Sequence, residues 1–431
     1  MPLRSALGML TASVVCAATL APVTGCGSSD QPPDEGSHVV AIFSWWTAGG
    51  EKEALDALIA YHLKSHPNDR IINGALEGAD NAQQRLEELI AQKNYPDTFQ
   101  LNAGLGLRQW AARTASDGTK LLSPLDSMPG ADSLKGALPA AVLSAVSFEN
   151  HLYAVPVNVH RNNSLFYNKK IFDDNHLTPP TTFDELIQVS DALSKLPNKV
   201  IPLAVGSKEP WTITLLAFEN LMVARNGGQY FLDYFSGKKT ADDPGVVATL
   251  NDTMALWKYT DPSGRTLLWD EAVAQVESGQ AAMTIMGDWA KGHFVSVGQK
   301  VGVDFGQIPT PGSQESFVYN PDCFPIMTGA HNPRGAMDFL STFASVGGED
   351  VFNPLKGSIP ARSDAEVSLY DAASQRAISD FQSKELVLAL SGLISADVNA
   401  LIDTAFGSFA DSQNPEDVLS VLRANYSKFA P

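Results

Sequence analysis

Cysteine is scarce in this sequence, with three residues among 431. Cys16 and Cys26 belong to the apolar N-terminal stretch or directly follow it, so Cys323 is the one cysteine in the rest of the chain. A disulfide needs two cysteines within one fold, which excludes an intramolecular disulfide framework after residue 26. Stability must instead come from a hydrophobic core, which a chain of this length can build.

Positively charged residues are also few. Lys and Arg number 30 against 48 Asp and Glu, which gives a net charge of −18. Proteins that bind nucleic acid need a basic surface, so this balance argues against nucleic acid as a partner. With 44% hydrophobic and 18% charged residues, the composition is that of a globular protein with two or more domains.

Familiar catalytic motifs are missing too. The sequence contains no G-x-S-x-G, no H-E-x-x-H and no G-x-x-x-x-G-K-[ST]. His62 and His66 are spaced like two metal ligands on a helix, but no third ligand is evident, and a half-buried helix end explains the pair better. The many carboxylates form no pattern that selects a catalytic pair. We therefore expect neither an enzyme nor a metal or cofactor site.

Long apolar runs are confined to the N-terminus. Such a run follows Arg4, from about Ala6 to Pro22, and is typical of a secretory signal peptide over residues 1–25. The next letters, "VTGC", resemble a bacterial lipobox, which implies cleavage before Cys26 and lipidation of its sulfur. Ordinary signal cleavage nearby, with Cys26 unmodified, is the alternative. Residues 26–37 are small and polar, as a flexible tether would be.

Beyond the tether, strand-like and helix-like segments alternate. Residues 39–46 ("VVAIFSWW") form an apolar, β-branched strand candidate, and an amphipathic helix follows that ends before Pro67. The order continues as β-α-β, which predicts a parallel sheet covered by helices. These three further segments are residues 69–78, 81–94 and 95–104, and later strand candidates are residues 281–289, 303–310 and 316–327.

This order of elements predicts an α/β protein of two lobes. We expect an N-terminal lobe of residues 38–156 plus about 317–357, and a C-terminal lobe of residues 157–316 plus about 358–431. The chain would cross near Val155–Asn158 and again near the later strands. Ligands of such folds bind in a crevice at the carboxyl ends of strands.

The adjacent tryptophans Trp45 and Trp46 raise a question of their own. Neighbouring residues on a strand point to opposite faces, so both indoles cannot fill one core. They lie where the strand gives way to the Gly49–Gly50 turn and a helix that begins with Glu51. We expect one indole to line a cleft and the other to be core. Trp46, which is nearer the helix, is our prediction for the ligand.

Several segments together resemble a known family. They are "FSWWTAGGE", "YPDTFQLNAG", "YAVPVNVHRNNSLFYNKKIF", "GQAAMTIMGDWAKG" and "FNPLKGSIPAR". They resemble the extracellular sugar-binding proteins of bacterial ABC importers, and the glucose-type branch most. The resemblance implies a periplasmic-binding-protein-like fold whose two lobes close on a sugar at a hinge. It also implies a monomeric lipoprotein on the outer face of a membrane that delivers a mono- or oligosaccharide to permease subunits.

The resemblance also implies a set of ligand-binding residues. A sugar offers apolar C–H faces and a ring of hydroxyls, which suit aromatic plates and planar polar groups. Trp211 joins the set for its place at a helix start, and Asn102 because it stands where the branch has a histidine. His160 and Arg161 are expected to organise the hinge rather than to contact sugar. The implied and added residues are Trp45, Trp46, Glu51, Gln100, Asn102, Trp211, Trp269, Trp289, Asp322 and Lys356.

Each of these residues also has a purely structural interpretation. Trp269 could form a hydrophobic staple at the start of a helix, and Trp289 could be part of the hydrophobic core of a lobe. Glu51 could interact with a helix dipole, and Lys356 could cap a helix before Gly357.

The sequence departs from the glucose-type branch at two positions. Asn102 replaces one imidazole, and Ser391 or Gly392 stands where the branch has another. We therefore expect weak glucose binding and better binding of another mono- or oligosaccharide. A secreted carbohydrate-active hydrolase and a sugar sensor for a signalling receptor are the alternatives to an importer component.

Overall fold

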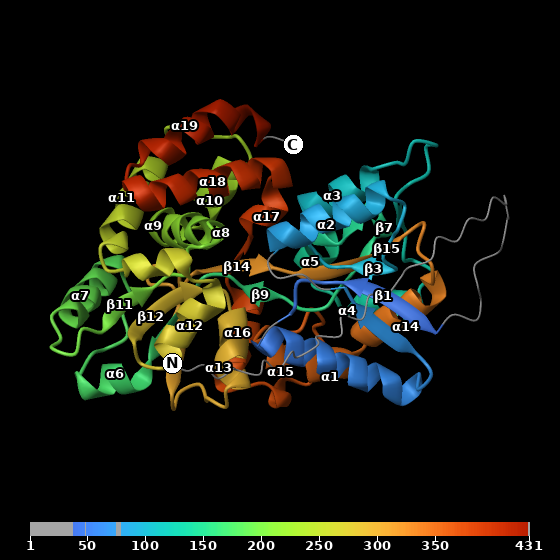
Figure 1. Ribbon diagram of the computed structural model, residues 1–431, viewed down its shortest axis with the longest axis horizontal. Coiled ribbons are helices and arrows are strands. Elements are labelled where there is room, and N and C mark those ends of the chain that lie inside the picture. Colours follow the sequence, from blue (N-terminus) through green and yellow to red (C-terminus); the bar gives the residue numbers. More distant parts are fainter. Residues whose placement is uncertain (1–37, 48, 75–78, 430–431) are drawn as a thin grey trace, which may run out of the picture.

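The computed structural model describes residues 38–47, 49–74 and 79–429. The expected signal peptide, Cys26 and the tether lie outside the described residues. The chain folds into two α/β lobes, which confirms the predicted fold class (Figure 1). The blue and cyan N-terminal elements gather in one lobe, at the right of Figure 1, and the green and yellow elements in the other.

The first lobe is built on a sheet with the path β2-β1-β3-β15-β4, and β5 and β8 also pair with β15. β1 runs parallel to β2 and β3, whereas β15 runs antiparallel to its partners. The predicted β-α-β-α-β order is confirmed as β1, α1, β2, α2 and β3. The strands of this lobe are β1 (Val39–Phe43), β2 (Arg70–Asn73), β3 (Thr98–Phe99), β4 (Leu101–Asn102), β5 (Leu122–Ser123), β6 (Ser147–Phe148), β7 (His151–Leu152), β8 (Ala154–Pro156) and β15 (Asp322–Met327). Its helices are α1 (Gly49–Ser65), α2 (Ala79–Ala91), α3 (Leu105–Ala112), α4 (Ala131–Ala137), α5 (Ala140–Ala145), α14 (Pro333–Phe343) and α15 (Val346–Lys356).

The second lobe contains a four-stranded sheet with the order β11-β12-β10-β13. β10 runs antiparallel to β12 and β13, and β11 runs parallel to β12. The strands are β10 (Ser164–Asn168), β11 (Ile201–Ala204), β12 (Ala281–Met286) and β13 (Phe305–Pro309). The helices are α6 (Lys169–Asp174), α7 (Phe183–Ser194), α8 (Trp211–Thr214), α9 (Val223–Asn226), α10 (Gly228–Phe235), α11 (Pro244–Trp257), α12 (Trp269–Glu277), α13 (Trp289–Ser296), α17 (Leu390–Leu393), α18 (Ala396–Ser412) and α19 (Glu416–Asn425). A π-helix (Leu215–Met222) joins α8 to α9, and 3₁₀ turns occupy Pro262–Thr266 and Tyr426–Lys428.

A small third sheet lies where the chain passes between the lobes. Its order is β16 (Glu385–Leu388), β14 (Ser316–Asn320) and β9 (His160–Arg161). The segment at 316–327, predicted as one strand region, is thus two strands in different sheets, with Pro321 between them. α16 (Ala372–Ser383) and a 3₁₀ turn (Val367–Leu369) precede β16.

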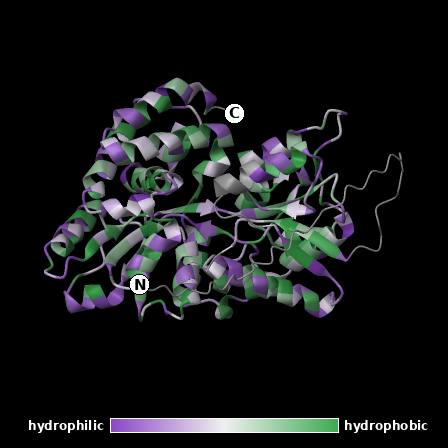
Figure 2. Ribbon diagram, viewed as in Figure 1, coloured by the Kyte–Doolittle hydropathy of each residue, from purple (hydrophilic) through white to green (hydrophobic). Residues whose placement is uncertain are grey.

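Separate hydrophobic clusters define the two lobes. One contains side chains from Val40 to Val159, and two others contain side chains between Leu165 and Phe305 and near the C-terminus. The first cluster also includes Ile359, Ala377 and Phe381. The lobe boundaries given above stay a prediction. In Figure 2 the helices alternate between hydrophilic and hydrophobic residues, as helices that cover a sheet on one side do.

Two pairs of glycines let the lobes touch. Gly49 and Gly50 are the first residues of α1 rather than a separate turn. A Cβ atom on Gly50 would lie 2.4 Å from the carbonyl oxygen of Gly292 in α13, so the two backbones need this glycine. A Cβ atom on Gly104, before α3, would lie 2.6 Å from the carbonyl oxygen of Gly392 in α17. Each pair joins an element of the first lobe to one of the second.

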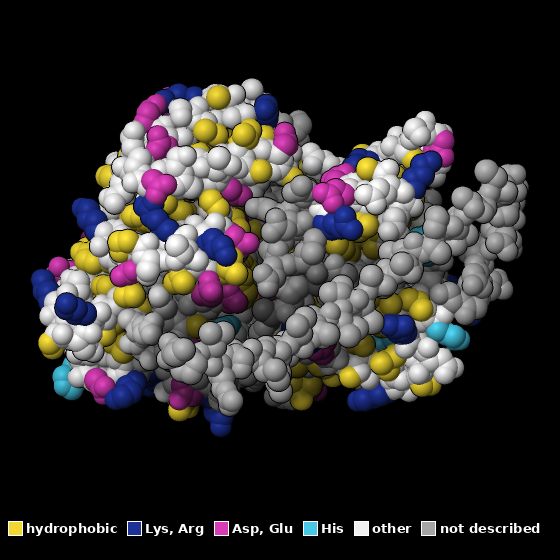
Figure 3. Space-filling view, in the orientation of Figure 1, with side chains coloured by type: hydrophobic (Ala, Val, Ile, Leu, Met, Phe, Trp, Pro, Cys, Tyr) yellow, Lys and Arg dark blue, Asp and Glu magenta, His cyan; other side chains and the backbone are white. Residues whose placement is uncertain are grey.

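Among the described residues, no helix combines the length of a membrane span with a sufficiently apolar sequence. On the face shown in Figure 3, acidic and basic side chains are mixed over both lobes.

Candidate functional site

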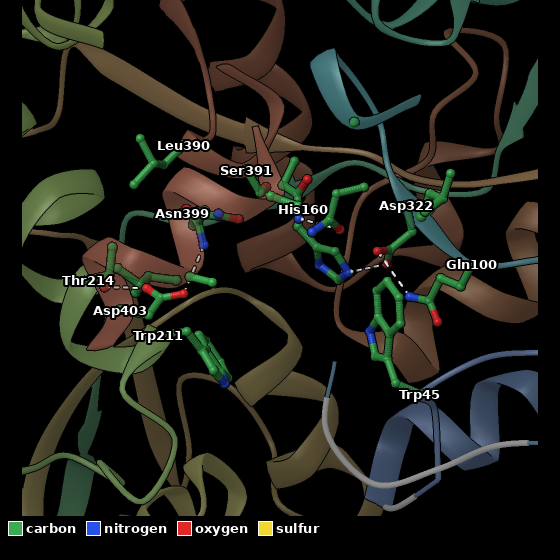
Figure 4. Close-up of a pocket in the computed structure, with 18 of the residues that line it drawn as sticks. Trp45, Gln100, His160, Trp211, Thr214, Asp322, Leu390, Ser391, Asn399 and Asp403 are labelled. Carbon is green, nitrogen blue, oxygen red and sulfur yellow. Dashed lines mark hydrogen bonds and ion pairs between the residues drawn. The ribbon is translucent and has the colours of Figure 1, made fainter. Parts of the chain in front are cut away.

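A cavity of about 840 Å³ lies between the lobes and is lined by side chains from both. Its volume is in the upper part of the range of about 300–1,000 Å³ that is typical of small-molecule sites. Figure 4 shows part of its lining, with Trp45, Gln100 and Asp322 on one side and Trp211, Thr214 and Asp403 on the other.

Nine of the ten residues predicted to bind ligand line this cavity. Most of them follow a strand or begin a helix, where the order of elements predicted a ligand site, whereas Asp322 begins β15 and Lys356 ends α15. The nine are Trp45, Glu51, Gln100, Asn102, Trp211, Trp269, Trp289, Asp322 and Lys356. The structure thus brings them together around one space, and Trp46 is the exception.

The assignment of Trp46 to the ligand is wrong in this structure. Its side chain is 1% exposed, and its ring centroid lies 4.9 Å from that of Phe352 and 5.4 Å from that of Phe324. Trp45, which is partly buried, lines the cavity instead. β1 ends at Phe43, and the backbone N–H of Trp46 donates to the Ser44 hydroxyl at 3.1 Å. The tryptophans therefore lie beyond the strand, and nearness to the helix does not decide which one faces the ligand.

A chain of hydrogen bonds fixes the amide at the first-lobe end of the cavity. The Ser44 hydroxyl donates to Gln100 Oε1 at 2.7 Å, and Gln100 Nε2 donates to Asp322 Oδ1 at 3.1 Å. Gln100 is 2% exposed, so its amide is held in place before any ligand arrives. This arrangement suits an amide that recognises a ligand hydroxyl from a fixed position.

Charged groups meet at the base of the cavity. His160 donates from Nδ1 to Asp288, and its Nε2 lies 3.0 Å from Asp322 Oδ2. Lys356 Nζ donates to Glu51 Oε1 at 2.7 Å and lies 3.1 Å from His160 Nε2. Three carboxylates thus surround two cationic groups, and all except Glu51 are 3% exposed or less. We call these five residues the buried charge cluster.

The buried charge cluster determines the ionisation of its members. Burial and the Lys356 charge oppose protonation of His160, but Asp288 and Asp322 outweigh them and raise the pKa of its imidazole. Burial would raise the pKa of Asp322, but His160, Lys356 and the Asn158 amide hold that pKa below its ordinary value. Asp322 is therefore ionised and already hydrogen-bonded within the protein.

Arg161 lies next to the buried charge cluster but does not line the cavity. Its Nη1 donates to Asp380 Oδ2 of α16 at 2.5 Å, and its guanidinium lies 4.9 Å from the centroid of the Phe317 ring. Its backbone N–H donates to Asp288. Arg161 thus joins a crossing strand to α16 and to the segment before α13, and its role in organising the hinge stays a prediction. His160, in contrast, lines the cavity.

The second lobe contributes three tryptophans to the cavity wall. Trp269 and Trp289 are the first residues of α12 and α13, and Trp211 is the first residue of α8. The rings of Trp211 and Trp289 have centroids 6.2 Å apart, and the His160 imidazole meets Trp289 edge-on at 5.1 Å. All three indoles pack against the hydrophobic cluster of α12, α13 and β12 and also line the cavity. Core packing and ligand contact are therefore compatible for them.

The sequence did not predict one polar group at the end of the cavity that the second lobe forms. Asp403 of α18 is 6% exposed and accepts hydrogen bonds from Thr214 Oγ1 and from Asn399 Nδ2. All three residues line the cavity (Figure 4). Asn399 and Asp403 are four residues apart within a largely apolar helix, and this spacing on one helix face was the available signal.

Sequence reasoning also missed Glu219, in the π-helical segment. The π-helix covers Leu215–Met222, and π-helical turns are often found at functional sites. Glu219 lines the cavity, accepts from Asn162 Nδ2 at 2.5 Å and accepts from the Leu390 backbone N–H at 2.9 Å. Burial raises the pKa of its carboxyl. Glu219 thereby connects the second lobe to two segments near the lobe crossings.

The two positions that lack imidazoles have different surroundings. Asn102 lines the cavity and its Oδ1 accepts from Asn320 Nδ2 at 3.2 Å. Ser391 also lines the cavity, whereas a Cβ atom on Gly392 would lie 2.8 Å from the carbonyl oxygen of Ala103. A side chain at residue 392 would therefore clash with the first lobe.

The histidine pair lies at the end of α1 in the first lobe, with His62 in the last turn of the helix and His66 directly after it. The rings of His62 and His66 stack at 4.3 Å, and His62 bonds to Thr342 Oγ1 and Asp69 Oδ2. Burial lowers the pKa of His62. In the part of the chain that the structure describes, no group of three His, Cys, Asp or Glu side chains is arranged to hold a metal ion.

The sequence matches a known family over most of this fold. Residues 48–350 match the bacterial extracellular solute-binding proteins, and the chain belongs to this family. It is 36% identical over 392 residues to an uncharacterised ABC transporter extracellular-binding protein of Pyrococcus horikoshii, which covers 89% of this chain and 85% of that protein. It is 31% identical over 352 residues to a probable sugar-binding periplasmic protein of Mesorhizobium japonicum, which covers 80% of each. The predicted membership of the ABC importer binding proteins is confirmed, while the glucose-type branch stays a prediction.

Solved structures show the same fold. A chitin oligosaccharide binding protein superposes with a TM-score of 0.78 at 19% identity, covering 91% of this chain and 99% of the other. A bacterial solute receptor with a preference for β-D-galactopyranose superposes with a TM-score of 0.77 at 18% identity, covering 91% and 98%.

The two adjacent tryptophans should differ in the effect of their removal. We expect Trp45→Ala to weaken ligand binding by about 2 kcal/mol or more, roughly thirtyfold in Kd, because an aromatic plate at the cavity wall is lost. We expect Trp46→Ala to lower the free energy of unfolding by about 3–5 kcal/mol, because it leaves a cavity in the core. Calorimetric affinity and denaturant unfolding of both variants check this, and each variant is the control for the other. Unchanged affinity in Trp45→Ala would contradict the assignment.

Proposed function

We propose that this chain is the sugar-binding component of an ABC importer, which captures a sugar outside the cytoplasm and delivers it to permease subunits. The cavity between the lobes carries the proposal, because it combines aromatic plates with fixed polar groups. Membership of the extracellular solute-binding family supports it. The relatives include probable sugar-binding periplasmic proteins and a xylose/arabinose-binding protein of Haloferax volcanii.

The chemistry of the lining suits a sugar. Indoles such as Trp45 and Trp289 can stack on the apolar C–H face of a sugar ring and remove it from water. Amide and carboxylate groups such as Gln100 and Asp322 can accept hydrogen bonds from ring hydroxyls. A hydrogen bond from a hydroxyl to a charged group contributes about 1.5–3 kcal/mol. Several such contacts would give both affinity and a defined orientation.

The two carboxylates that the resemblance implied as sugar contacts, Asp322 and Glu51, are both engaged within the protein. A glycoside hydrolase needs two carboxyl groups that act on one bond, one as an acid and one as a base or nucleophile. Asp322 is ionised and accepts from Gln100, Asn158 and His160, and Glu51 is paired with Lys356. We infer that the protein returns its sugar unchanged. No observation specifically favours a hydrolase or a sensor subunit.

The identity of the sugar is narrowed by two positions. Asn102 offers an amide where the glucose-type branch has an imidazole, and Gly392 has no room for a side chain. We infer that glucose binds weakly and that another sugar is preferred.

We also propose that Cys26 carries the lipid that holds the protein, as a monomer, at the outer face of a membrane. The support is the "VTGC" sequence at the end of the apolar N-terminal run and the polar residues that follow it. A flexible tether of this kind would let the folded domain reach the permease.

A sugar panel tests the proposed function. The full chain with Cys26→Ala, purified without detergent, should bind at least one mono- or oligosaccharide with a Kd of about 10 μM or lower, roughly −7 kcal/mol. Isothermal titration calorimetry measures the affinity, and chromatography of the recovered sugar measures any conversion. Absence of binding across the panel at millimolar concentrations would contradict the proposal, and so would steady release of cleaved products.

Fatty-acid labelling tests the anchor. In cells that express the full chain, we expect labelling of the natural sequence and no labelling of Cys26→Ala, because the sulfur is the acceptor. Cys323→Ala is the matched control and should be labelled normally, because that cysteine is buried in the first lobe. Equal labelling of the natural chain and Cys26→Ala would show that the lipid is elsewhere or absent.

A further inference from the structure

The cavity has polar side chains at both of its ends. The family resemblance predicted mainly the residues of one end. The first end contains Trp45, Gln100 and Asp322, with the buried charge cluster behind them. The second end is built by α8 and α18 of the other lobe. In Figure 4 the two ends lie on opposite sides of the view, with His160 between them.

The second end is a built site. Asp403 is 6% exposed, and its carboxylate is oriented by Thr214 of α8 and by Asn399 one turn earlier on α18, whose Nδ2 lies 2.9 Å from Oδ2. A carboxyl group buried at the wall of a cavity is costly unless it is hydrogen-bonded, and Thr214 and Asn399 supply such bonds. A carboxylate has about four acceptor positions, so one that lines a cavity can bond to protein donors and to a ligand hydroxyl together.

The helices α8 and α18 pack closely at this end of the cavity. A Cβ atom on Gly407 of α18 would lie 3.1 Å from Pro210 Cγ, directly before α8, so the helices approach closely. The hydrogen bond from Thr214 to Asp403 joins the same two helices. A closely packed pair of helices can hold polar groups in a position that suits one ligand orientation.

An aromatic plate accompanies the polar group. Trp211 lines the cavity from the start of α8, and its Nε1 donates to Glu209 Oε2 at 3.2 Å, which fixes the orientation of the indole. The first end offers the same combination, because Trp45 lies beside Gln100 and Asp322 (Figure 4). A plate with hydroxyl acceptors at each end describes two places for a sugar ring.

The volume agrees with two rings. The cavity of about 840 Å³ approaches the upper limit of about 1,000 Å³ for sites that enclose drug-sized ligands. A single monosaccharide is smaller than such ligands and would leave one polar end in contact with water alone.

We propose that the cavity holds two linked sugar rings, one at each end, and that the ligand is a disaccharide or a longer oligosaccharide. Asp403 accepts hydrogen bonds from hydroxyls of the second ring, and Trp211 packs on its apolar face. This inference rests on the proposed function, because it specifies the class of sugar that the same cleft takes.

Calorimetry with paired ligands tests the inference. The full chain with Cys26→Ala is titrated with glucose, galactose, xylose and N-acetylglucosamine, and with maltose, cellobiose, lactose, xylobiose and chitobiose. We expect at least one disaccharide to bind about tenfold or more tightly than either of its constituent monosaccharides. Asp403→Asn should then raise the Kd for that disaccharide by about tenfold or more, the usual effect of a lost charge-assisted bond. The same substitution should change the Kd for monosaccharides by less than about twofold.

Control variants distinguish a loss of ligand contact at the second end from a general effect of the substitution. Asp411→Asn removes the same charge from α18 at a side chain that is 77% exposed, and it should change neither affinity. If Asp403→Asn does not fold, Asn399→Ala and Trp211→Leu test the same end from two different helices. Monosaccharides that bind as tightly as disaccharides, or equal losses for both classes in the variants, would overturn the inference and leave the proposed function intact. Absence of binding by any sugar would overturn both.

Discussion

The buried charge cluster is the constraint on which this structure depends. Asp322 and Glu51 come from the first lobe, Asp288 from the second, His160 from a crossing strand and Lys356 from the end of α15. A buried charge without a partner costs several kcal/mol, so the elements that carry these groups must meet in one arrangement. His160 bonds to a carboxylate of each lobe, and the cluster therefore fixes the hinge as well as the base of the cavity.

The rest of the site follows from this fixed base. The glycine pairs Gly50–Gly292 and Gly104–Gly392 let the lobes touch beside it, and the π-helical segment brings Glu219 against the crossing segments. Aromatic side chains at helix starts then face a space with polar groups at both ends. A ligand that contacts both lobes would favour the closed arrangement over an open one, which is how a hinged binding protein couples capture to a change of shape.

Much of this could be predicted from the sequence. The alternation of strands and helices indicated two α/β lobes, and the motifs indicated the cavity residues that follow strands or begin helices. The choice between Trp45 and Trp46 failed because strand alternation ends at Phe43, before either indole. Asp403 and Glu219 were missed because their partners are remote: Thr214 is 189 residues from Asp403, and Leu390 is 171 residues from Glu219. No local pattern in the sequence indicates such contacts, because they form only when distant segments of the chain pack together within the second lobe.

The titration of His160 tests the central claim most directly. Nuclear magnetic resonance of the histidine-labelled chain, with the signal assigned by its loss in His160→Gln, measures the pKa of this imidazole. The account predicts a value above the ordinary 6.5 or so, because Asp288 and Asp322 stabilise the charged ring. Since the folded pKa exceeds the unfolded one, the stability gained from the charged ring is present below pH 6.5 and is lost as the pH rises through the folded value. A measured pKa at or below 6.5 would contradict the account, because burial would then have left the imidazole neutral and the cluster without its central cation.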